Sequence, residues 1–253
     1  MSTRRTVTAW QCPPKTILVG VDFGEPSARA LAIAKVLASA FQARLRALHA
    51  ERFDPPPYFT IDQITRLQEE RHVALAAATS HLARFVAASA YQVESFVVDE
   101  PPVEAILDNS AGADLIVLGT HGRRGPGRWW LGSVAERVVR VAAVPALVTR
   151  AASTPPLDVF ERVALVLDGA HADETARGCA AGLAGIGAGP LIEAGAIAQC
   201  DANALQQATL VVMATRRNRH SWGLTDPVAE VLGSCERPVL FVPTAANHTE
   251  VAK

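Results

Sequence analysis

The stretch DLIVLGTHGRRGPGRWWLGSVAERVVR, residues 114–140, joins an apolar run to a helical pattern through a loop rich in glycine and arginine. The run at 114–118 has the length and character of a strand buried on both faces of a parallel sheet. Residues 119–133 hold five of the chain's 17 glycines, three arginines and two adjacent tryptophans. A helical pattern begins at Val134. Backbone N–H groups in such a loop and at a helix start bind anions, so an α/β fold with an anion site is one interpretation. A simple turn is the other.

Strand-like and helix-like runs alternate through the first 150 residues. Strands are predicted at 16–21, 44–50, 91–98, 114–118 and 145–149. Helices are predicted at 27–40, 62–90, 102–110 and 134–141. This alternation predicts a parallel sheet with helices on both faces, and right-handed crossovers make a doubly wound sheet the simplest topology.

The pattern restarts after a proline-bearing linker at 151–156. Segments of the second half repeat segments of the first in the same order: 162–169 repeats 17–22, 210–215 repeats 115–120, 228–230 repeats 134–136, and 237–242 repeats 144–148. Repetition in the same order indicates duplication. The second copy is shorter by about one strand and the long helix. We therefore predict two doubly wound α/β domains, a five-stranded one at 15–150 and a truncated one at 161–243.

Composition excludes several classes of protein. The 253 residues are 49% hydrophobic with a net charge of -1, which gives no chain-wide case for a DNA partner. The N-terminal segment 1–14 has no apolar run long enough for a signal peptide or a membrane helix. We therefore expect a cytoplasmic protein without a membrane partner. The four cysteines lie far apart without zinc-ligand spacing, so reduced thiols and no metal ligands among them are expected.

Two loops at strand ends suggest a ligand site. In an open parallel sheet, ligands bind at the carboxyl ends of the strands, where Asp22 follows the first strand and Gly119 follows the fourth. Gly132 and Ser133 start the next helix, whose free N–H groups favour a phosphate, while the Ser133 hydroxyl adds a donor. A carboxylate at Asp22 suits a ribose hydroxyl or an amine. Together these residues predict a nucleotide site, although neither GxxxxGK[ST] nor GxGxxG after the first strand is present.

The spacing Gly119-x2-Gly122-x9-Gly132-Ser133, within GTHGRRG…LGSVAERVVR…VPALVTR, resembles the ATP-binding signature of universal stress proteins. The resemblance covers residues 15–150 and extends over 161–243 as a truncated copy, like the tandem members of that family. It implies an adenine nucleotide alpha hydrolase-like fold, ATP as ligand, and Mg²⁺ or Mn²⁺ as a frequent companion of the nucleotide.

The resemblance also implies roles for individual residues. Those expected near the adenosine are Val21, Asp22, Ala50, Leu118 and Gly119. Those expected at the phosphates, mainly through backbone groups and one hydroxyl, are Gly122, Gly132, Ser133 and Val134. His121 lies inside the loop and is interpreted as a loop-positioning residue, with a general-base role as the alternative. Trp129 and Trp130 are interpreted as a packed lid or a contact surface.

The second half lacks this signature. Ala214 and Arg217 stand where the first half has Gly119 and Gly122. Asp226 and Pro227 stand near the position of the helix start, where a carboxylate opposes phosphate and a proline removes a donor. The basic run at 216–220 suits a solvated surface or an anion contact. We therefore expect ATP to bind the first domain only.

Three functional interpretations follow. The first is an ATP-binding regulatory protein with slow or no hydrolysis. The second is a weak ATPase or phosphotransferase, ranked lower because the loop contains no lysine. The third is an interaction scaffold that binds no nucleotide. The apolar last strands of the two copies, with a linker from Arg150 to Val159, predict that the copies pair within one chain as a pseudo-dimer, which leaves room for a further homodimer.

Overall fold

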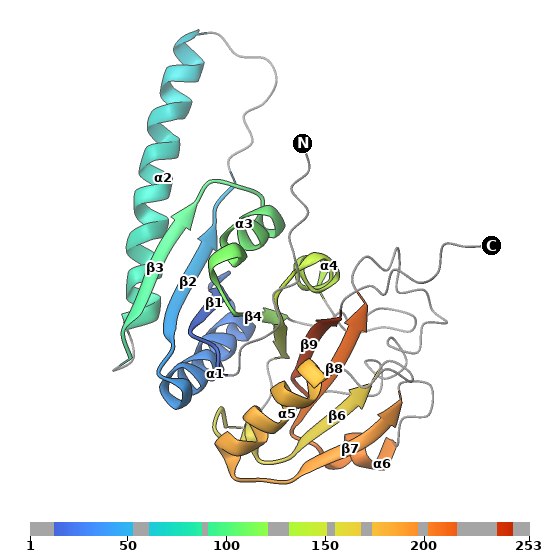
Figure 1. Ribbon diagram of the computed structural model, residues 1–253. Helices are drawn as coiled ribbons and strands as arrows, with labels where there is room; N and C mark the ends of the chain where they lie inside the picture. Colours follow the sequence, from blue (N-terminus) through green and yellow to red (C-terminus); the bar gives the residue numbers. More distant parts are fainter. Residues whose placement is uncertain are drawn as a thin grey trace, which may run out of the picture.

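The computed structural model describes residues 13–52, 61–87, 91–120, 132–150, 155–167, 174–196, 202–216 and 237–244. They form a nine-stranded sheet of order β3-β2-β1-β4-β5-β9-β8-β6-β7, with helices on both faces (Figure 1). The strands are β1 Thr16–Gly20, β2 Arg44–Ala50, β3 Val93–Val98, β4 Leu115–Thr120, β5 Ala146–Arg150, β6 Val163–Leu167, β7 Leu191–Ala196, β8 Leu210–Arg216 and β9 Val239–Thr244. The helices are α1 Glu25–Phe41, α2 Ile61–Ala87, α3 Pro102–Asn109, α4 Ser133–Val141, α5 Glu174–Gly187 and α6 Ala202–Gln207, with the 3-10 turns η1 Ser110–Gly112 and η2 Asp158–Phe160.

The first half is the doubly wound parallel sheet expected from the alternation. Strands β1, β2, β3, β4 and β5 pair in parallel, and β1 lies between β2 and β4. The predicted boundaries agree within a few residues. The third strand begins at Val93 and not at Tyr91, because the Tyr91 hydroxyl lies within hydrogen-bond distance of the Ala38 and Ala43 carbonyls. Its side chain thus ties the end of α1 to the start of β2.

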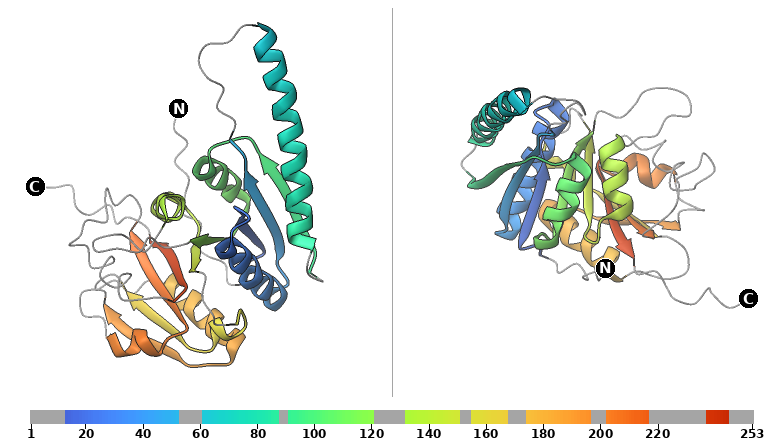
Figure 2. Two further views of the ribbon diagram at one scale, coloured as in Figure 1. Left: turned by 180° about the vertical axis from the view of Figure 1, so that it is seen from behind. Right: turned by 90° about the horizontal axis from the view of Figure 1, so that it is seen from above.

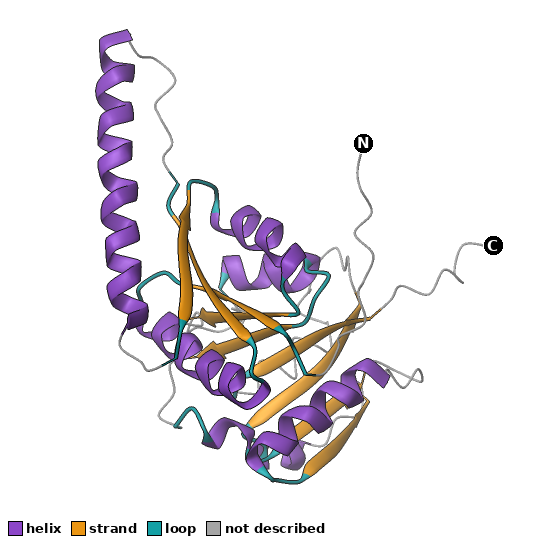
Figure 3. Cartoon of the chain, turned by 60° about the vertical axis from the view of Figure 1, so that its left-hand side comes forward, coloured by secondary structure: helices purple, strands orange, loops and turns teal. Residues whose placement is uncertain are grey.

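Two hydrophobic cores lie on opposite faces of the sheet. One is built by α1, α2, η2 and α5, and the other by α3, α4 and α6. Figure 3 shows these helices covering both sides of the strands. On α1 the buried apolar positions recur at helical spacing: Ala30, Leu31, Ile33, Ala34, Leu37 and Ala38. Because strand side chains alternate between the faces, each central strand feeds both cores.

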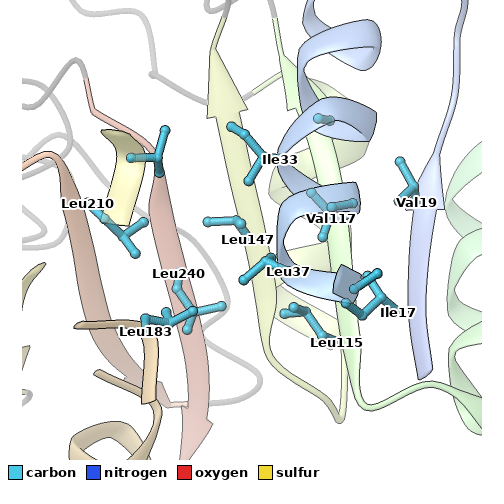
Figure 4. Packing of buried hydrophobic residues seen from close by; sticks show 14 of the residues in the cluster. Ile17, Val19, Ile33, Leu37, Leu115, Val117, Leu147, Leu183, Leu210 and Leu240 are labelled. Carbon is cyan, nitrogen blue, oxygen red and sulfur yellow. The ribbon is translucent and has the colours of Figure 1, made fainter. Parts of the chain in front are cut away.

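The second half joins the first through its last strand. β9 pairs antiparallel with β5, in the register Ala146↔Phe241, Leu147↔Leu240 and Val148↔Val239, so the two expected fifth strands do lie side by side. The order β9-β8-β6-β7 repeats the order β5-β4-β1-β2. Within the described residues no strand lies outside β7, whereas β3 lies outside β2, as expected from the shorter second segment. The apolar core is continuous across the junction, where Leu147 and Leu240 meet near Leu37 (Figure 4).

The linker is shorter than expected, because Val159 and Phe160 in η2 are fully buried. The glycines at the end of α5 explain how they fit. A Cβ on Gly187 would lie 2.2 Å from the Phe160 carbonyl oxygen, and one on Gly189 would lie 1.6 Å from that of Glu161. Gly187 is the last residue of α5 and Gly189 follows the helix, and the absence of side chains at both lets η2 pack against the end of α5. Cys179 on α5 is buried in the same core.

The long helix α2 packs only by its C-terminal part. Leu82 and Val86 are buried, whereas Val73 is 70% exposed, and the N-terminal part extends past the sheet (Figures 1 and 2). An ion pair between Arg71 and Asp99 ties the middle of α2 to the end of β3. Among the described helices, none combines the length and apolar character that crossing a membrane requires.

Candidate functional site

The carboxyl ends of β1 and β4 meet at one edge of the sheet. The two strands pair in parallel up to Gly20↔Leu118, so Val21 and Gly119 continue side by side. From β1 the chain enters α1 on one face, and β4 is followed by α4 on the opposite face. A crevice opens where neighbouring connections diverge in this way, which is where open α/β sheets bind ligands.

The turn between β1 and α1 presents an exposed carboxylate. Asp22 Oδ1 accepts a hydrogen bond from the Gly24 N–H at 2.9 Å. Gly24 is the N-cap of α1, and as a glycine it has no side chain with which to cap the helix. The turn is therefore held by one oxygen of Asp22, whose side chain is exposed. This arrangement can accept a hydrogen bond from a sugar hydroxyl or an amine.

Two other carboxylates follow neighbouring strands, but both have positively charged or imidazole partners. Asp99, after β3, pairs with Arg71. Glu51, after β2, contacts His49 Nε2 at 3.0 Å. Asp22, in contrast, accepts from the backbone N–H of Gly24, which carries no net charge. Its charge therefore remains available for a ligand.

Gly119 is required by packing. A Cβ at this position would lie 2.2 Å from the carbonyl carbon of Pro26 and 2.5 Å from the Ser27 nitrogen, both backbone atoms in the first turn of α1. No side chain fits at such distances without moving the helix. Gly119 thus lets the end of β4 lie directly against the start of α1.

The start of α4 is fixed to the end of β4 by one hydrogen bond. The Gly132 N–H donates to Thr120 Oγ1 at 2.9 Å, and Gly132 is the N-cap of α4. The glycine has ordinary extended geometry (φ -68°, ψ 159°), so its role does not come from unusual backbone angles. Because its N–H is already used, the first-turn N–H groups of α4 without an intrahelical acceptor are those of Ser133, Val134 and Ala135. Ser133 is exposed and Val134 is half-buried.

The residues expected near the adenosine contribute backbone more than side chains. Val21 and Leu118 are 5% and 4% exposed, and their side chains belong to the two cores. Ala50 is half-buried at the end of β2. The Val21 N–H donates to the Leu48 carbonyl at 2.9 Å, which continues the β1–β2 ladder past the end of the strand.

Several predicted residues lie outside the described ranges. In the first half these are His121, Gly122, Trp129 and Trp130. In the second half they are Arg217, Asp226 and Pro227. Their roles stay predictions.

Three residues at the site had no predicted function: Phe23, His49 and Thr120. His49 and Thr120 stand within quoted motifs, but a hydrogen bond across 12 residues or between strands leaves no local pattern. For Phe23, the only feature of the sequence that could indicate a role is its position between Asp22 and Gly24. Within the described ranges no cluster of three His, Cys, Asp or Glu side chains could hold a metal ion.

The pKa of Lys35 on α1 is lowered by burial, and its ammonium donates to the Val86 carbonyl at 3.3 Å. That contact caps the last turn of α2. Burial likewise lowers the pKa of Arg29 on α1. Both side chains lie on the helix whose start Gly119 contacts.

A family model described as the universal stress protein family matches residues 14–150. This range is more than half of the 253 residues. The chain belongs to the universal stress protein family. The match includes both loops of the crevice, Asp22 to Gly24 and Gly119 to Ser133.

Curated universal stress proteins resemble the same part of the chain. One from Thermus aquaticus is 36% identical over 143 residues, which are 54% of this chain and 98% of that protein. One from Mycobacterium tuberculosis is 33% identical over 139 residues, and the match spans 53% of this chain and 45% of the mycobacterial protein. The chain thus covers less than half of that longer relative.

Solved structures extend the likeness of fold to nearly the whole chain. A universal stress protein from Archaeoglobus fulgidus superposes with a TM-score of 0.63 over 91% of this chain and 99% of its own, at 16% identity. A putative universal stress protein from Pseudomonas aeruginosa gives a TM-score of 0.58, covering 91% and 94% of the two chains at 17% identity. At these identities the likeness concerns the fold alone.

Proposed function

We propose that this universal stress protein binds ATP at the carboxyl ends of β1 and β4, and that occupancy regulates its contacts with other molecules, with slow or no hydrolysis. Residues 161–243 act as a degenerate second copy that binds no nucleotide. The two copies form a pseudo-dimer within one chain, for which the antiparallel β5–β9 pair is the support.

The observation that carries the proposal is the juxtaposition of two opposite kinds of group at one crevice. Asp22 offers an exposed carboxylate on one side. On the other side the Thr120–Gly132 hydrogen bond holds the start of α4, whose first residue is the exposed Ser133, against the end of β4. A nucleotide has matching chemistry, with sugar hydroxyls that donate and phosphates that accept.

The restriction to one site rests on the second half. Ala214 in β8 is 2% exposed, and its methyl packs in the core beside α5. The corresponding position in the first half is Gly119, where the start of α1 fills that space. The crevice is thus built differently at the end of β8, and the sequence beyond it lacks the glycine spacing.

A regulatory role is favoured over turnover because the described part of the site has no general base. Asp22 holds its own turn through Oδ1 and is proposed to accept from the sugar, so it is not assigned to the phosphates. His49 has a contact on each ring nitrogen, to the Val21 carbonyl and to Glu51. A site of this kind can bind and orient a nucleotide without activating water.

Calorimetric titration of the purified chain with ATP, ADP and AMP tests the proposal. We expect one molecule of ATP to bind per chain. We expect ATP hydrolysis to be slower than the dissociation of ATP. Ser133→Ala should weaken the binding of ATP. Ser80→Ala, at an exposed serine on α2, should leave the binding of ATP unchanged. Two equivalent sites per chain, or no binding of any adenine nucleotide, would contradict the proposal, and rapid phosphate release would favour the enzyme interpretation.

A further inference from the structure

Phe23, directly after Asp22, holds a backbone conformation that residues with a side chain rarely adopt. Its φ is 62°, in the left-handed region where glycine is the usual residue. Gly24, which could adopt it freely, is the next residue and has a φ of -76°. Strain of this kind persists only where surrounding contacts over-determine it, and it concentrates at functional sites.

The ring of Phe23 supplies those contacts. Its centroid lies 4.3 Å from that of His81, with the ring planes 12° apart, and 4.4 Å from that of His49. Phe85 meets it edge-on at 5.6 Å. His81 and Phe85 belong to α2 and His49 to β2. Two elements outside the β1–α1 turn therefore hold the residue next to the exposed carboxylate.

His49 also holds the residue on the other side of Asp22. Its Nδ1 lies 2.7 Å from the Val21 carbonyl oxygen, and its Nε2 lies 3.0 Å from Glu51 Oε2. The Val21 carbonyl oxygen only accepts, so the contact at Nδ1 needs a hydrogen on that ring nitrogen. His49 thus fixes the Val21 carbonyl with its edge and supports the Phe23 ring with its face. Asp22 lies between two residues anchored by the same imidazole.

We propose that Phe23, His49 and His81 are positioning residues for the Asp22 carboxylate, and that α2 is coupled to the candidate nucleotide site through the contact of His81 with Phe23. The positioning of Asp22 follows from these contacts alone. The effect on ligand affinity rests on the proposed function. Coupling is reciprocal, so a ligand that needs Asp22 ordered also stabilises the contact between Phe23 and α2.

The test compares His81→Ala with His72→Ala. Both histidines are exposed on α2, but the ring contacts of Phe23 include His81 and not His72. Without nucleotide, His81→Ala should speed hydrogen exchange of the amides at 22–24 about fivefold or more, in the range of such couplings. It should weaken ATP binding by a similar factor. His72→Ala should leave both within about twofold of the original chain, as expected of a surface change remote from the site.

Each result separates this inference from the function on which it depends. Faster exchange in His81→Ala, with no ATP binding by the original chain, leaves the positioning contact established and removes the nucleotide as ligand. Normal ATP binding with identical behaviour of the two histidine variants overturns the coupling and leaves the nucleotide function in place.

Phe23→Gly provides a second test in which folding is not the obstacle. Glycine adopts a φ of 62° without strain, so the turn itself is favoured, but the ring is lost. We expect weaker ATP binding and faster exchange of the α2 amides at 82–87. If the turn alone positions Asp22, Phe23→Gly will bind ATP as well as the original chain or better, and the proposal is wrong.

Discussion

The ends of β4 and β8 occupy the same place in the two halves of the sheet, yet they meet their helices differently. At the end of β4, Gly119 has no side chain, and the backbone of Pro26 and Ser27 fills the space. At the corresponding point of β8, the Ala214 methyl fills it as part of the core. One methyl group thus distinguishes the two strand ends at this position.

The outer edges of the halves differ as well. In the first half, β3 and α2 lie beyond β2, and α2 carries the contacts that anchor Phe23. Within the described part of the second half, β7 is the outermost strand of the sheet. The half with the candidate site is therefore also the half with the additional elements, as expected if those elements support the site.

The largest expected effect concerns the junction that joins the halves. Leu240 and Val242 on β9 are 1% and 0% exposed, in a core shared with α1 and β5. Replacing both with lysine should cost about 5 kcal/mol or more in the free energy of unfolding, because two unpaired charges enter a closed core. The whole chain should lose stability. Urea denaturation monitored by circular dichroism measures this loss.

Leu191→Lys on β7 is the control for this prediction, since Leu191 is 36% exposed and should tolerate the change within about 1 kcal/mol. Limited proteolysis supplies the decisive comparison. If the variant with lysine at positions 240 and 242 loses protection from proteolysis only in residues 161–243, and the first half stays as stable as before, the two halves are independent. The junction is then not a shared core.

The next effect tests the difference between the strand ends directly. Gly119→Ala should destabilise the chain by about 1–3 kcal/mol and abolish ATP binding, because its Cβ would lie 2.2 Å from backbone atoms of Pro26. Ala214→Gly, the reciprocal change, should cost about 1–2 kcal/mol through lost burial and added chain entropy, and leave ATP binding intact. Equal effects on binding would show that the two ends do not differ in function.

A smaller effect is expected at the hydrogen bond that positions α4. Thr120→Val keeps the shape of a side chain that is 5% exposed but removes the acceptor for the Gly132 N–H. The free energy of unfolding should fall by about 1–2 kcal/mol, and the affinity for ATP should fall about tenfold. Thr149→Val, at a buried threonine whose hydroxyl makes only a long contact of 3.4 Å to the Leu118 carbonyl, is the matched control. Calorimetry that finds both variants alike would remove Thr120 from the site.

The smallest effect on stability belongs to Asp22. Asp22→Ala removes one hydrogen bond in an exposed turn, so the free energy of unfolding should change by about 0.5–1 kcal/mol. ATP binding should nevertheless weaken by about tenfold, since the ligand loses a charged acceptor. Asp22→Ala thus separates ligand contact from folding. Unchanged affinity in this variant would remove Asp22 from the proposed ligand contacts.

The sequence by itself determined the layered α/β fold, the order of elements in the first half and the restart of the pattern in the second. Apolar runs such as Ile17–Val19 and Ile116–Leu118 are long enough for buried strands, and helical spacing on α1 is a local property of the chain. The position of Asp22 and Gly119 at neighbouring strand ends also followed, because parallel strands end at one edge.

The tertiary structure alone decided how those strand ends become a site. The Gly132 N–H is bonded to Thr120 across 12 residues, Gly119 meets the backbone of Pro26 from 93 residues away, and Phe23 is held by rings on β2 and α2. None of these contacts has a period or a spacing in the sequence. They depend on which surfaces the folded sheet brings within a few ångströms, and that is set by packing of the whole core.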